Sequence, residues 1–529
     1  PASPHLGNPG QPPCRKAWAL GAYADADRAQ DDRPQEEPLM EEFRALRQRL
    51  AAGDEASAAP LAYLPPFLEV IRSVDTSGPI TGAALAALDN LLRGGLVRPG
   101  GAEAPAAIHA IVGAVTHCRF EATDPDSDEA VLARILHVLL QCLKCPAGRL
   151  LSDDAVCSAV QTCYRIGHQT GKKGGLLRQT SRHILHEAVR ELFTRLPAIL
   201  ERGGGGEGGR GVAGVEGGAG EAAAGEAGPS AGGRLEGMEG EATSQSHQAA
   251  AAAVGPPAGP YGEGCLKDIL HFLASLISDP EEEPDIEGED LATLGLSLTR
   301  VALEASGEHL ARCPTLVEVV QGGLTFSLLD AAASQNLLVL SLACGIASHL
   351  YAHLKSFLRF QLEAFVSCVL MRVAEGRDSS YEQQEVVLEA LVDLCRQPGF
   401  MVDMYANFDC ALDCPNVFEG LASLLSKNSF PVNSPLATVH LLSLEGLLAI
   451  VNNIQTRCEL DAHSTQGEMN GAGAEEGRSG ASGQAPAGAT AGAGVGGADG
   501  AGAGGLWAPP TVADPVAWAR AMQLKKTLK

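Results

Sequence analysis

Aromatic residues and the period-two alternation typical of strands are both scarce in this sequence. Aromatic side chains make up 4% of the 529 residues, although hydrophobic residues make up 45%. Leu and Ala dominate the apolar set, which favours helices over sheets. The composition therefore predicts an all-α chain with sizeable cores, and the length predicts more than one domain.

Basic residues are also in deficit. The chain has 39 Lys and Arg against 64 Asp and Glu, a formal net charge of −25. Nucleic-acid phosphates require a basic surface, so we expect no nucleic-acid partner. The net charge gives no general attraction to anionic lipid either. Much of the acidity is local, because the run DPEEEPDIEGED (279–290) has eight acids and no base.

Targeting segments are not apparent. The N-terminal stretch is polar and Pro-rich, unlike a signal peptide, and no apolar run approaches the ~18–20 residues of a membrane span. The fourteen cysteines lie singly in apolar patterns such as VLLQCLKC (138–145), typical of reduced, buried thiols. We expect a cytoplasmic chain. Because the sequence begins with Pro1, we expect its N-terminus to be processed or incomplete.

Two stretches have too few large apolar side chains to form a core. Residues 201–260 and 461–513 consist mainly of Gly, Ala and Glu, and such segments cannot bury enough surface to offset chain entropy. Both are predicted to be disordered linkers. They divide the chain into a first block (15–200), a second block (261–460) and a short tail (514–529).

Both blocks show the spacing of amphipathic helices. RHILHEAVRELFTRL (182–196) places its apolar residues in one continuous stripe. LLVLSLACGIASHL (337–350) is apolar on nearly all faces, which predicts a central, buried helix. Helices joined by short turns over two long blocks predict two α-solenoid domains of stacked, armadillo- or HEAT-like helices. No exact repeat is present, so this prediction rests on helix spacing.

Motifs for catalysis or metal binding are weak. Cys142 and Cys145 form a C-x-x-C, but Cys142 lies in a helical stripe and no second pair has the spacing of a zinc site. No nucleophile elbow occurs. We therefore expect no metal, no cofactor and no active site within these residues.

The sequence GHQTGKKGG (167–175) departs from a phosphate-binding P-loop. Gly167 is one residue too close to the second glycine, and no Ser or Thr follows Lys172. A basic loop between helices fits better. A lipid headgroup is a candidate ligand of the four basic residues that gather here, Lys172, Lys173, Arg178 and Arg182.

The stretch MYANFDCALDC (404–414) follows a helix that Pro398 and Gly399 end. It is predicted to be a corner between helices, in which short polar side chains bond the nearby backbone. Phe408 and Cys410 are expected to point into the core. The number of specific residues suggests a packed interface as well.

Several long stretches resemble the N-terminal half of a GNOM/GBF-class large Arf guanine-nucleotide exchange factor. In the first block they are residues 63–85, 117–143 and 178–193, which match the family's dimerisation and cyclophilin-binding domain. In the second block they are residues 358–374 and 381–433, which match its homology-upstream-of-Sec-seven (HUS) domain. The box of that domain corresponds to Tyr405, Asn407, Phe408, Asp409 and Cys410.

The resemblance implies a regulatory role at Golgi and endosomal membranes in vesicle transport. It implies a homodimer through residues 15–200, a contact between the two domains that involves the box, a cyclophilin as a further partner, and peripheral membrane association. Residues 514–529 resemble the lead-in to the Sec-seven exchange domain, through which alone an Arf GTPase would be bound. That domain is missing from the sequence, so nucleotide exchange by this chain is not expected.

Two alternatives stay open on the sequence alone. One is a generic α-solenoid scaffold that binds peptides and has no link to Arf, in which case the box is only a corner of the fold. The other is an enzyme with its own active site, which is disfavoured because no set of catalytic side chains converges.

Overall fold

The computed structural model describes residues 36–51, 59–120, 125–169, 175–204, 259–278, 286–411, 414–431 and 435–472. Across these ranges every regular element is a helix, so the prediction of an all-α solenoid is confirmed. Most of both predicted linkers and all of the tail lie outside the described residues.

The first block contributes eight α-helices to the described part of the chain. They are α1 (Glu36–Ala51), α2 (Pro65–Arg72), α3 (Gly78–Arg93), α4 (Ala104–Thr116), α5 (Pro125–Lys144), α6 (Asp153–Gln169), α7 (Gly175–Thr194) and α8 (Leu196–Gly204). The last of these continues into residues 201–204, which the sequence assigned to the linker.

The second block begins with α9 (Glu263–Ser278), α10 (Ile286–Ser306), α11 (Pro314–Val319), α12 (Thr325–Ala331), α13 (Leu337–Leu354), α14 (Arg359–Phe365) and α15 (Arg372–Ala374). It continues with α16 (Tyr381–Arg396), α17 (Phe400–Met404), α18 (Val417–Ser429) and α19 (Thr438–Ala472). Three π-helical turns, η5 (Val320–Leu324), η6 (Val366–Met371) and η7 (Tyr405–Asp409), extend α11, α14 and α17 without a break.

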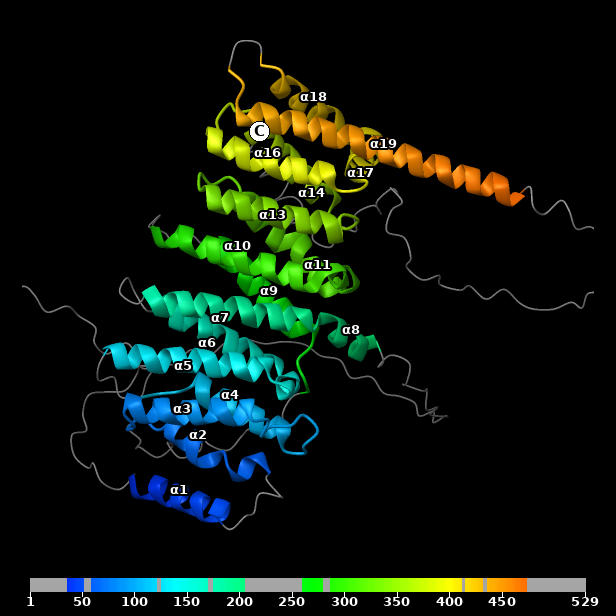
Figure 1. The fold of residues 1–529 in the computed structure, drawn as a ribbon. Helices are drawn as coiled ribbons and strands as arrows, with labels where there is room; N and C mark the ends of the chain where they lie inside the picture. Colours follow the sequence, from blue (N-terminus) through cyan, green and yellow to red (C-terminus); the bar gives the residue numbers. More distant parts are fainter. Residues whose placement is uncertain are drawn as a thin grey trace, which may run out of the picture.

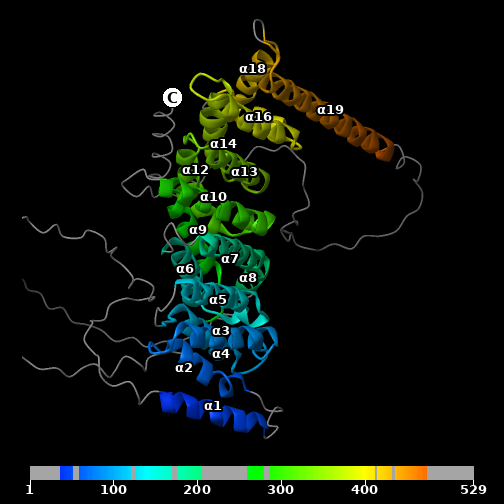
Figure 2. The ribbon, with the colours of Figure 1, turned by 60° about the vertical axis from the view of Figure 1, so that its left-hand side comes forward.

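The helices stack along one axis in the order of the sequence, from α1 at one end to α18 and α19 at the other (Figure 1; Figure 2). The two blocks lie in one stack. Helices α6 and α7 of the first block pack directly on α9 and α10 of the second, and a single hydrophobic core includes buried residues from Leu64 to Ile450. Each layer buries its apolar face against the next, as in other solenoids.

Local signals set where helices of the second block begin. The Asn336 side chain accepts hydrogen bonds from the first backbone amides of α13, and Ser380 with Gln383 forms a capping box at α16. Gly399 has a φ of 82°, a conformation that glycine adopts without strain, and it turns the chain from α16 into α17. The break predicted at Pro398 and Gly399 therefore occurs where expected.

Helix α13 corrects one expectation from the sequence. By length and composition alone, its 18 residues could cross a membrane, and 50% of them are buried inside the protein. The expectation that no apolar run approaches the length of a membrane span was therefore wrong. The helix packs between α10 and α16. Its apolar character thus accompanies a central place in the stack, as the sequence predicted.

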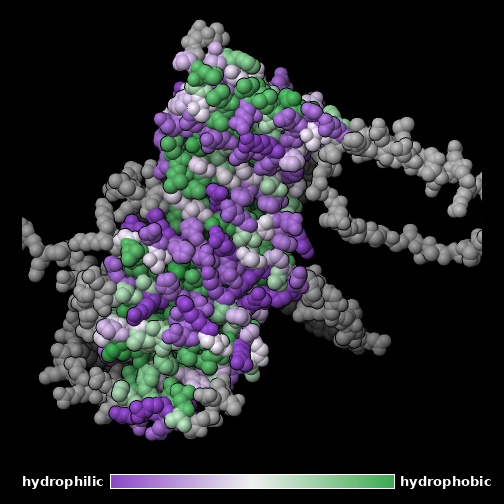
Figure 3. All heavy atoms as spheres, in the orientation of Figure 1, coloured by the Kyte–Doolittle hydropathy of each residue, from purple (hydrophilic) through white to green (hydrophobic). Residues whose placement is uncertain are grey.

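Helix α19 ends the stack with an apolar outer stripe. The exposed side chains of Leu441, Leu444, Leu448 and Val451 recur at helical spacing, and apolar residues gather over this end of the molecule (Figure 3). At these four positions the outer side of the helix is apolar, whereas the end of many solenoids is polar. The helix also continues to Ala472, whereas a disordered linker was predicted from residue 461; extending an existing helix is far less costly than nucleating one.

The close packing of α6 on α7 makes a testable prediction at Gly167. A methyl group there would lie 2.4 Å from Oγ and 2.7 Å from Cβ of Ser181, which is itself buried and bonded to the Cys163 carbonyl. Because Ser181 Cβ cannot rotate away, we expect Gly167→Ala to lower the free energy of unfolding by about 1–3 kcal/mol in urea titrations. Gly113 of α4 has no atom within 4 Å of the same position.

Gly113→Ala is therefore the matched control, and its better helix propensity should stabilise the protein by about 1 kcal/mol. Equal urea midpoints for the two variants would contradict the close approach of α6 and α7.

Candidate interaction sites at the junction and at the box

Tyr261 anchors the second block to the first. Its side chain is 1% exposed, its backbone amide donates to the Leu151 carbonyl at 2.7 Å, and its hydroxyl accepts from Arg195 Nη1 at 3.1 Å. Arg202 donates to its carbonyl at 3.2 Å. Burial raises the pKa of the phenol, which outweighs the opposite effect of Arg195. Tyr261 is therefore a buried, neutral side chain that contacts the first block at the point where the second block begins.

Arg195 is held in place by groups from the first block. It donates to the Leu143 carbonyl at 2.6 Å and to the Glu191 carboxylate at 2.7 Å. With 8% of its side chain exposed, this charge needs such partners. The guanidinium that receives the Tyr261 hydroxyl is thus positioned by groups of the first block.

Side chains of paired helices continue the junction. Tyr164 of α6 meets Phe272 of α9 edge to face at 5.3 Å, and the Asp153 carboxylate accepts from the Gly262 amide at 2.9 Å. His186 of α7 lies 3.1 Å from the Ser297 hydroxyl of α10. Asp153 at the start of α6 contacts Gly262 just before α9, and Tyr164 later in α6 contacts Phe272 later in α9. The two helices therefore run parallel.

At the opposite end, a buried carboxylate fixes the helix that carries the box. Asp403 of α17 is 1% exposed, and one of its oxygens accepts from the Tyr351 hydroxyl and from Lys355 Nζ, each at 2.7 Å. Burial and then the bond to Asp403 raise the pKa of Tyr351, so the phenol stays protonated as the donor. The sequence analysis missed this trio. Its signal was an aspartate inside the apolar run FMVDM.

Two residues of the box are interior. Asn407 donates to the Asp403 carbonyl at 2.9 Å and is 2% exposed, and Phe408 is fully buried. Arg359 of α14 donates to the Asn407 carbonyl at 2.5 Å and lies 5.9 Å from the centre of the Phe408 ring. Arg359 therefore ties α14 to η7, and the Asn407 side chain bonds η7 back to α17.

The other three box residues lie toward the surface. Both oxygens of the half-buried Asp409 carboxylate accept from the first amides of α18, at Phe418 and Glu419, at 2.9 Å. Tyr405 is 54% exposed and touches Phe418 edge to face at 5.8 Å. Cys410 is exposed, so the expectation that it points into the core was wrong; Asp409 ends η7 just before it, and the chain leaves the helix there.

The structure brings the five box residues together in η7 and its end, but far from the first block (Figure 1). The contacts between the blocks come from α6, α7 and α8 with α9 and α10. The predicted contact of the box with residues 15–200 is therefore not part of the junction within one chain.

The predicted basic cluster is described only in part. Arg178 and Arg182 are half-buried on α7, which also carries Leu176 with 76% exposure. Lys172 and Lys173 lie outside the described residues. Gly167 lies within α6, not in a loop. Cys142 and Cys145 are both buried. Within the described ranges, no group of three His, Cys, Asp or Glu side chains is arranged to hold a metal.

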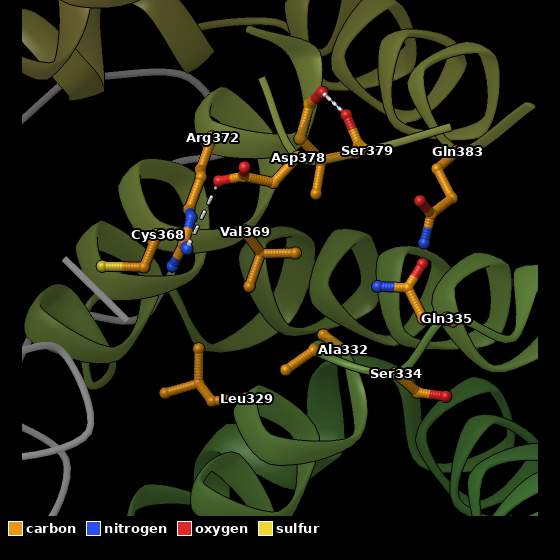
Figure 4. A pocket seen from close by; sticks show the side chains of 12 residues that line it. Leu329, Ala332, Ser334, Gln335, Cys368, Val369, Arg372, Asp378, Ser379 and Gln383 are labelled. Atoms are coloured by element: carbon orange, nitrogen blue, oxygen red, sulfur yellow. Dashed lines mark hydrogen bonds and ion pairs between the residues drawn. The ribbon is translucent and has the colours of Figure 1, made fainter. Parts of the chain in front are cut away.

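A cavity of about 170 Å³ opens between the α12–α13 turn, η6 and the start of α16 (Figure 4). Arg372 and Asp378 on its wall face each other at 3.9 Å. Ser379 bonds to the Val373 carbonyl at 2.7 Å, and Gln383 to the Ser380 amide. Its polar groups serve the fold, so this cavity is a poor candidate for an active site.

Comparison with protein families identifies the second block. Residues 263–417 match the model of the Mon2/Sec7/BIG1-like HUS domain. The match runs from α9 to the first residue of α18 and contains the box.

Curated relatives extend the similarity to both blocks. The ARF guanine-nucleotide exchange factor GNOM of Arabidopsis thaliana is 38% identical over 453 residues, which cover 80% of this chain and 31% of the relative. GNL1 of the same plant is 37% identical over 83% of this chain and 32% of its own length. A Golgi-specific brefeldin A-resistance guanine nucleotide exchange factor 1 homolog of Caenorhabditis elegans is 30% identical over 82% of this chain. The chain thus spans about a third of such relatives.

The junction predicts that the blocks stay associated after the linker is cut. A site for a specific protease is placed within residues 205–258, and the cleaved chain is run on a size-exclusion column. We expect the two fragments to elute together. Tyr261→Ala should weaken this association, because it empties a buried pocket at a cost of about 3–5 kcal/mol.

The control is Tyr381→Ala, which changes an exposed tyrosine at the start of α16 and should leave co-elution unchanged. Separate elution of the unmutated fragments would contradict the junction.

Proposed function

The chain is homologous over 80% of its length to the GNOM-type large Arf guanine-nucleotide exchange factors and corresponds to their N-terminal region, and from this premise we propose that it regulates such a factor. In this role it pairs two copies, couples its two blocks and recruits the exchange factor to Golgi or endosomal membranes. The observation that carries the proposal is the continuous similarity to exchange factors across both solenoid blocks.

The form of the molecule supports a regulatory rather than a catalytic part. Among the described residues, the polar cluster of Asp403 with Tyr351 and Lys355 is centred on a buried carboxylate and joins two parts of the fold. A solenoid offers extended surfaces for protein partners. We therefore assign the action on an Arf GTPase to a Sec-seven domain beyond these two blocks. Binding of a cyclophilin by the first block stays a prediction.

The generic scaffold without a link to Arf is the weaker alternative. It explains the solenoid equally well but leaves the similarity of both blocks to exchange factors without a cause.

Self-association is proposed through residues 15–200, with the box as a second contact between copies. In the stack of one chain the box packs beside α17 and α18, away from the helices of the first block (Figure 1), which supports a contact between copies. Tyr405 and Cys410 are the exposed members of the box. They are thus the side chains available to a second copy, whereas Asn407 and Phe408 are not.

Two variants distinguish a role of the box in self-association from a role in the stability of the fold. Asp409→Ala removes the cap of α18 and should lower the free energy of unfolding by about 1–2 kcal/mol. Tyr405→Ala should leave stability within about 0.5 kcal/mol of the unmutated protein while weakening self-association. Thermal unfolding measures the first effect, and sedimentation equilibrium of the 54.7 kDa chain measures the second.

An unchanged dimer mass for Tyr405→Ala, together with a destabilised Asp409→Ala, would assign the box to the fold alone. A monomer in the unmutated protein would refute the proposed pairing.

Membrane recruitment is proposed through the start of α7. Leu176 is the most exposed large apolar side chain in the described residues, at 76%, and Arg178 and Arg182 follow it on the same helix. The start of a helix that carries an exposed apolar side chain and basic residues suits the boundary of an anionic bilayer, where each base contributes about 1 kcal/mol. The net charge of −25 opposes binding elsewhere, so we expect contact in one orientation.

Vesicle flotation tests this surface. The chain should float with phosphatidylcholine vesicles that contain phosphatidylserine, and less so without it or at high salt. The double variant Lys172→Glu, Lys173→Glu should lose flotation, whereas Lys427→Glu on α18, a charge reversal at the other end of the stack, should not. Equal flotation of all variants would exclude this surface, and a tagged chain that never reaches Golgi or endosomal membranes in cells would contradict recruitment.

A further inference from the structure

Two cysteines face each other across the junction. Cys157 of α6 and Cys265 of α9 are separated by 108 positions and by the linker, yet their sulfur atoms lie 3.8 Å apart. Cys157 is half-buried and Cys265 is fully buried. Tyr164 with Phe272 on one side, and Asp153 with Gly262 on the other, hold the two helices in register. The facing of the sulfurs is therefore set by the packing around them.

We propose that this pair is a redox-sensitive clip, in which oxidation joins Cys157 to Cys265 and ties the first block covalently to the second. A disulfide needs its sulfurs about 2.05 Å apart. The approach still required, about 1.8 Å, is within reach of side-chain rotation and a small adjustment of two helices already in contact. The inference goes beyond the regulatory role proposed above.

The two thiols differ in a way that assigns their roles. The hydrogen bond between the two sulfurs lowers the pKa of Cys157 and raises that of Cys265, which is the direction expected when Cys265 is the donor. Cys157 is also the thiol that solvent reaches. It is therefore the one that reacts first, and the buried Cys265 resolves the product.

The oxidant in this proposal is hydrogen peroxide, and the reaction has two steps. The Cys157 thiolate attacks hydrogen peroxide, breaks the O–O bond and becomes a sulfenic acid, while the displaced hydroxide takes a proton to form water. Cys265 then loses its proton and attacks the sulfenic sulfur. The second hydroxide leaves as water, so two thiols are oxidised by two electrons and one peroxide is reduced.

Nearby charges govern the rate of the first step. Asp268, Asp153 and Asp154 face the pair from both helices, and each disfavours a thiolate. Their effect opposes that of the hydrogen bond from Cys265. We therefore expect a slow reaction at neutral pH that accelerates as the pH rises and more Cys157 is deprotonated.

The bridge would fix the junction in its packed form. It closes a loop that contains the whole linker, and cross-links of long loops restrict the unfolded chain most. We expect the oxidised protein to melt roughly 5 °C higher than the reduced protein. Any regulatory motion that opens the junction would be blocked until a thiol reductant restores it.

The test uses the full chain with the protease site in residues 205–258. Reduced protein is treated with hydrogen peroxide, quenched with N-ethylmaleimide, cleaved, and run on a denaturing gel without reductant. The fragments should migrate as one cross-linked band that dithiothreitol separates, and peptide mapping should join the peptides of Cys157 and Cys265. Cys157→Ser and Cys265→Ala should each abolish the band, whereas Cys410→Ser and Cys458→Ser, which change exposed cysteines, should retain it.

The results of this test distinguish a failure of the proposed disulfide from a failure of the junction or of the proposed function. Fragments that separate on the gel but elute together on a native column would refute the clip and leave the junction standing. Recovery of Cys157 only as sulfenic or sulfinic acid would refute it as well. Because Cys157 is half-buried, its serine variant should keep the melting temperature of the reduced protein; the loss of the band in that variant is then chemical and not a failure to fold.

Discussion

Every layer of this solenoid has an apolar face that only the next layer can cover. This constraint explains why the two blocks form one stack although a long Gly- and Ala-rich segment separates them in the sequence. The face of α6 and α7 would otherwise lie open to water, and α9 and α10 bury it. The linker breaks the chain's path through the stack without breaking the core.

Specific polar contacts then set the register that the apolar faces leave undetermined. Burial of Leu and Val side chains is non-directional, so it holds two layers together without choosing their alignment. At the junction the alignment comes from Arg195, whose donors reach both Leu143 and Tyr261. At the far end it comes from Asp403, which draws the hydroxyl of Tyr351 and the ammonium of Lys355 to one oxygen. Each cluster joins parts of the chain that are distant in sequence, and so fixes how the layers align in the stack.

The box combines an internal and an external role in adjacent positions. Asn407 and Phe408 of the π-helical turn η7 are buried in the core, whereas the side chains of Tyr405 and Cys410 are exposed. Asp409 links the two by capping α18. Under the pairing proposed above, the box would act on a second copy directly through its exposed residues and indirectly through the orientation of α18. This division is compatible with a regulatory surface that depends on the integrity of the corner beneath it.

The sequence by itself determined the helical class, the break at Pro398 and Gly399 and the central place of the helix at 337–350, because periodicity and turn residues act within a few positions along the chain. It also determined the resemblance of both blocks to the N-terminal region of large Arf exchange factors. Only the tertiary structure decided that the blocks share one core, that Tyr261 is a buried anchor, that Asp403 bonds to Tyr351 of α13 and to Lys355 just after it, and that Cys157 faces Cys265. These features join residues about 50 to 110 positions apart. Local pattern does not encode such distances, because the match between two faces depends on how all the layers between them stack.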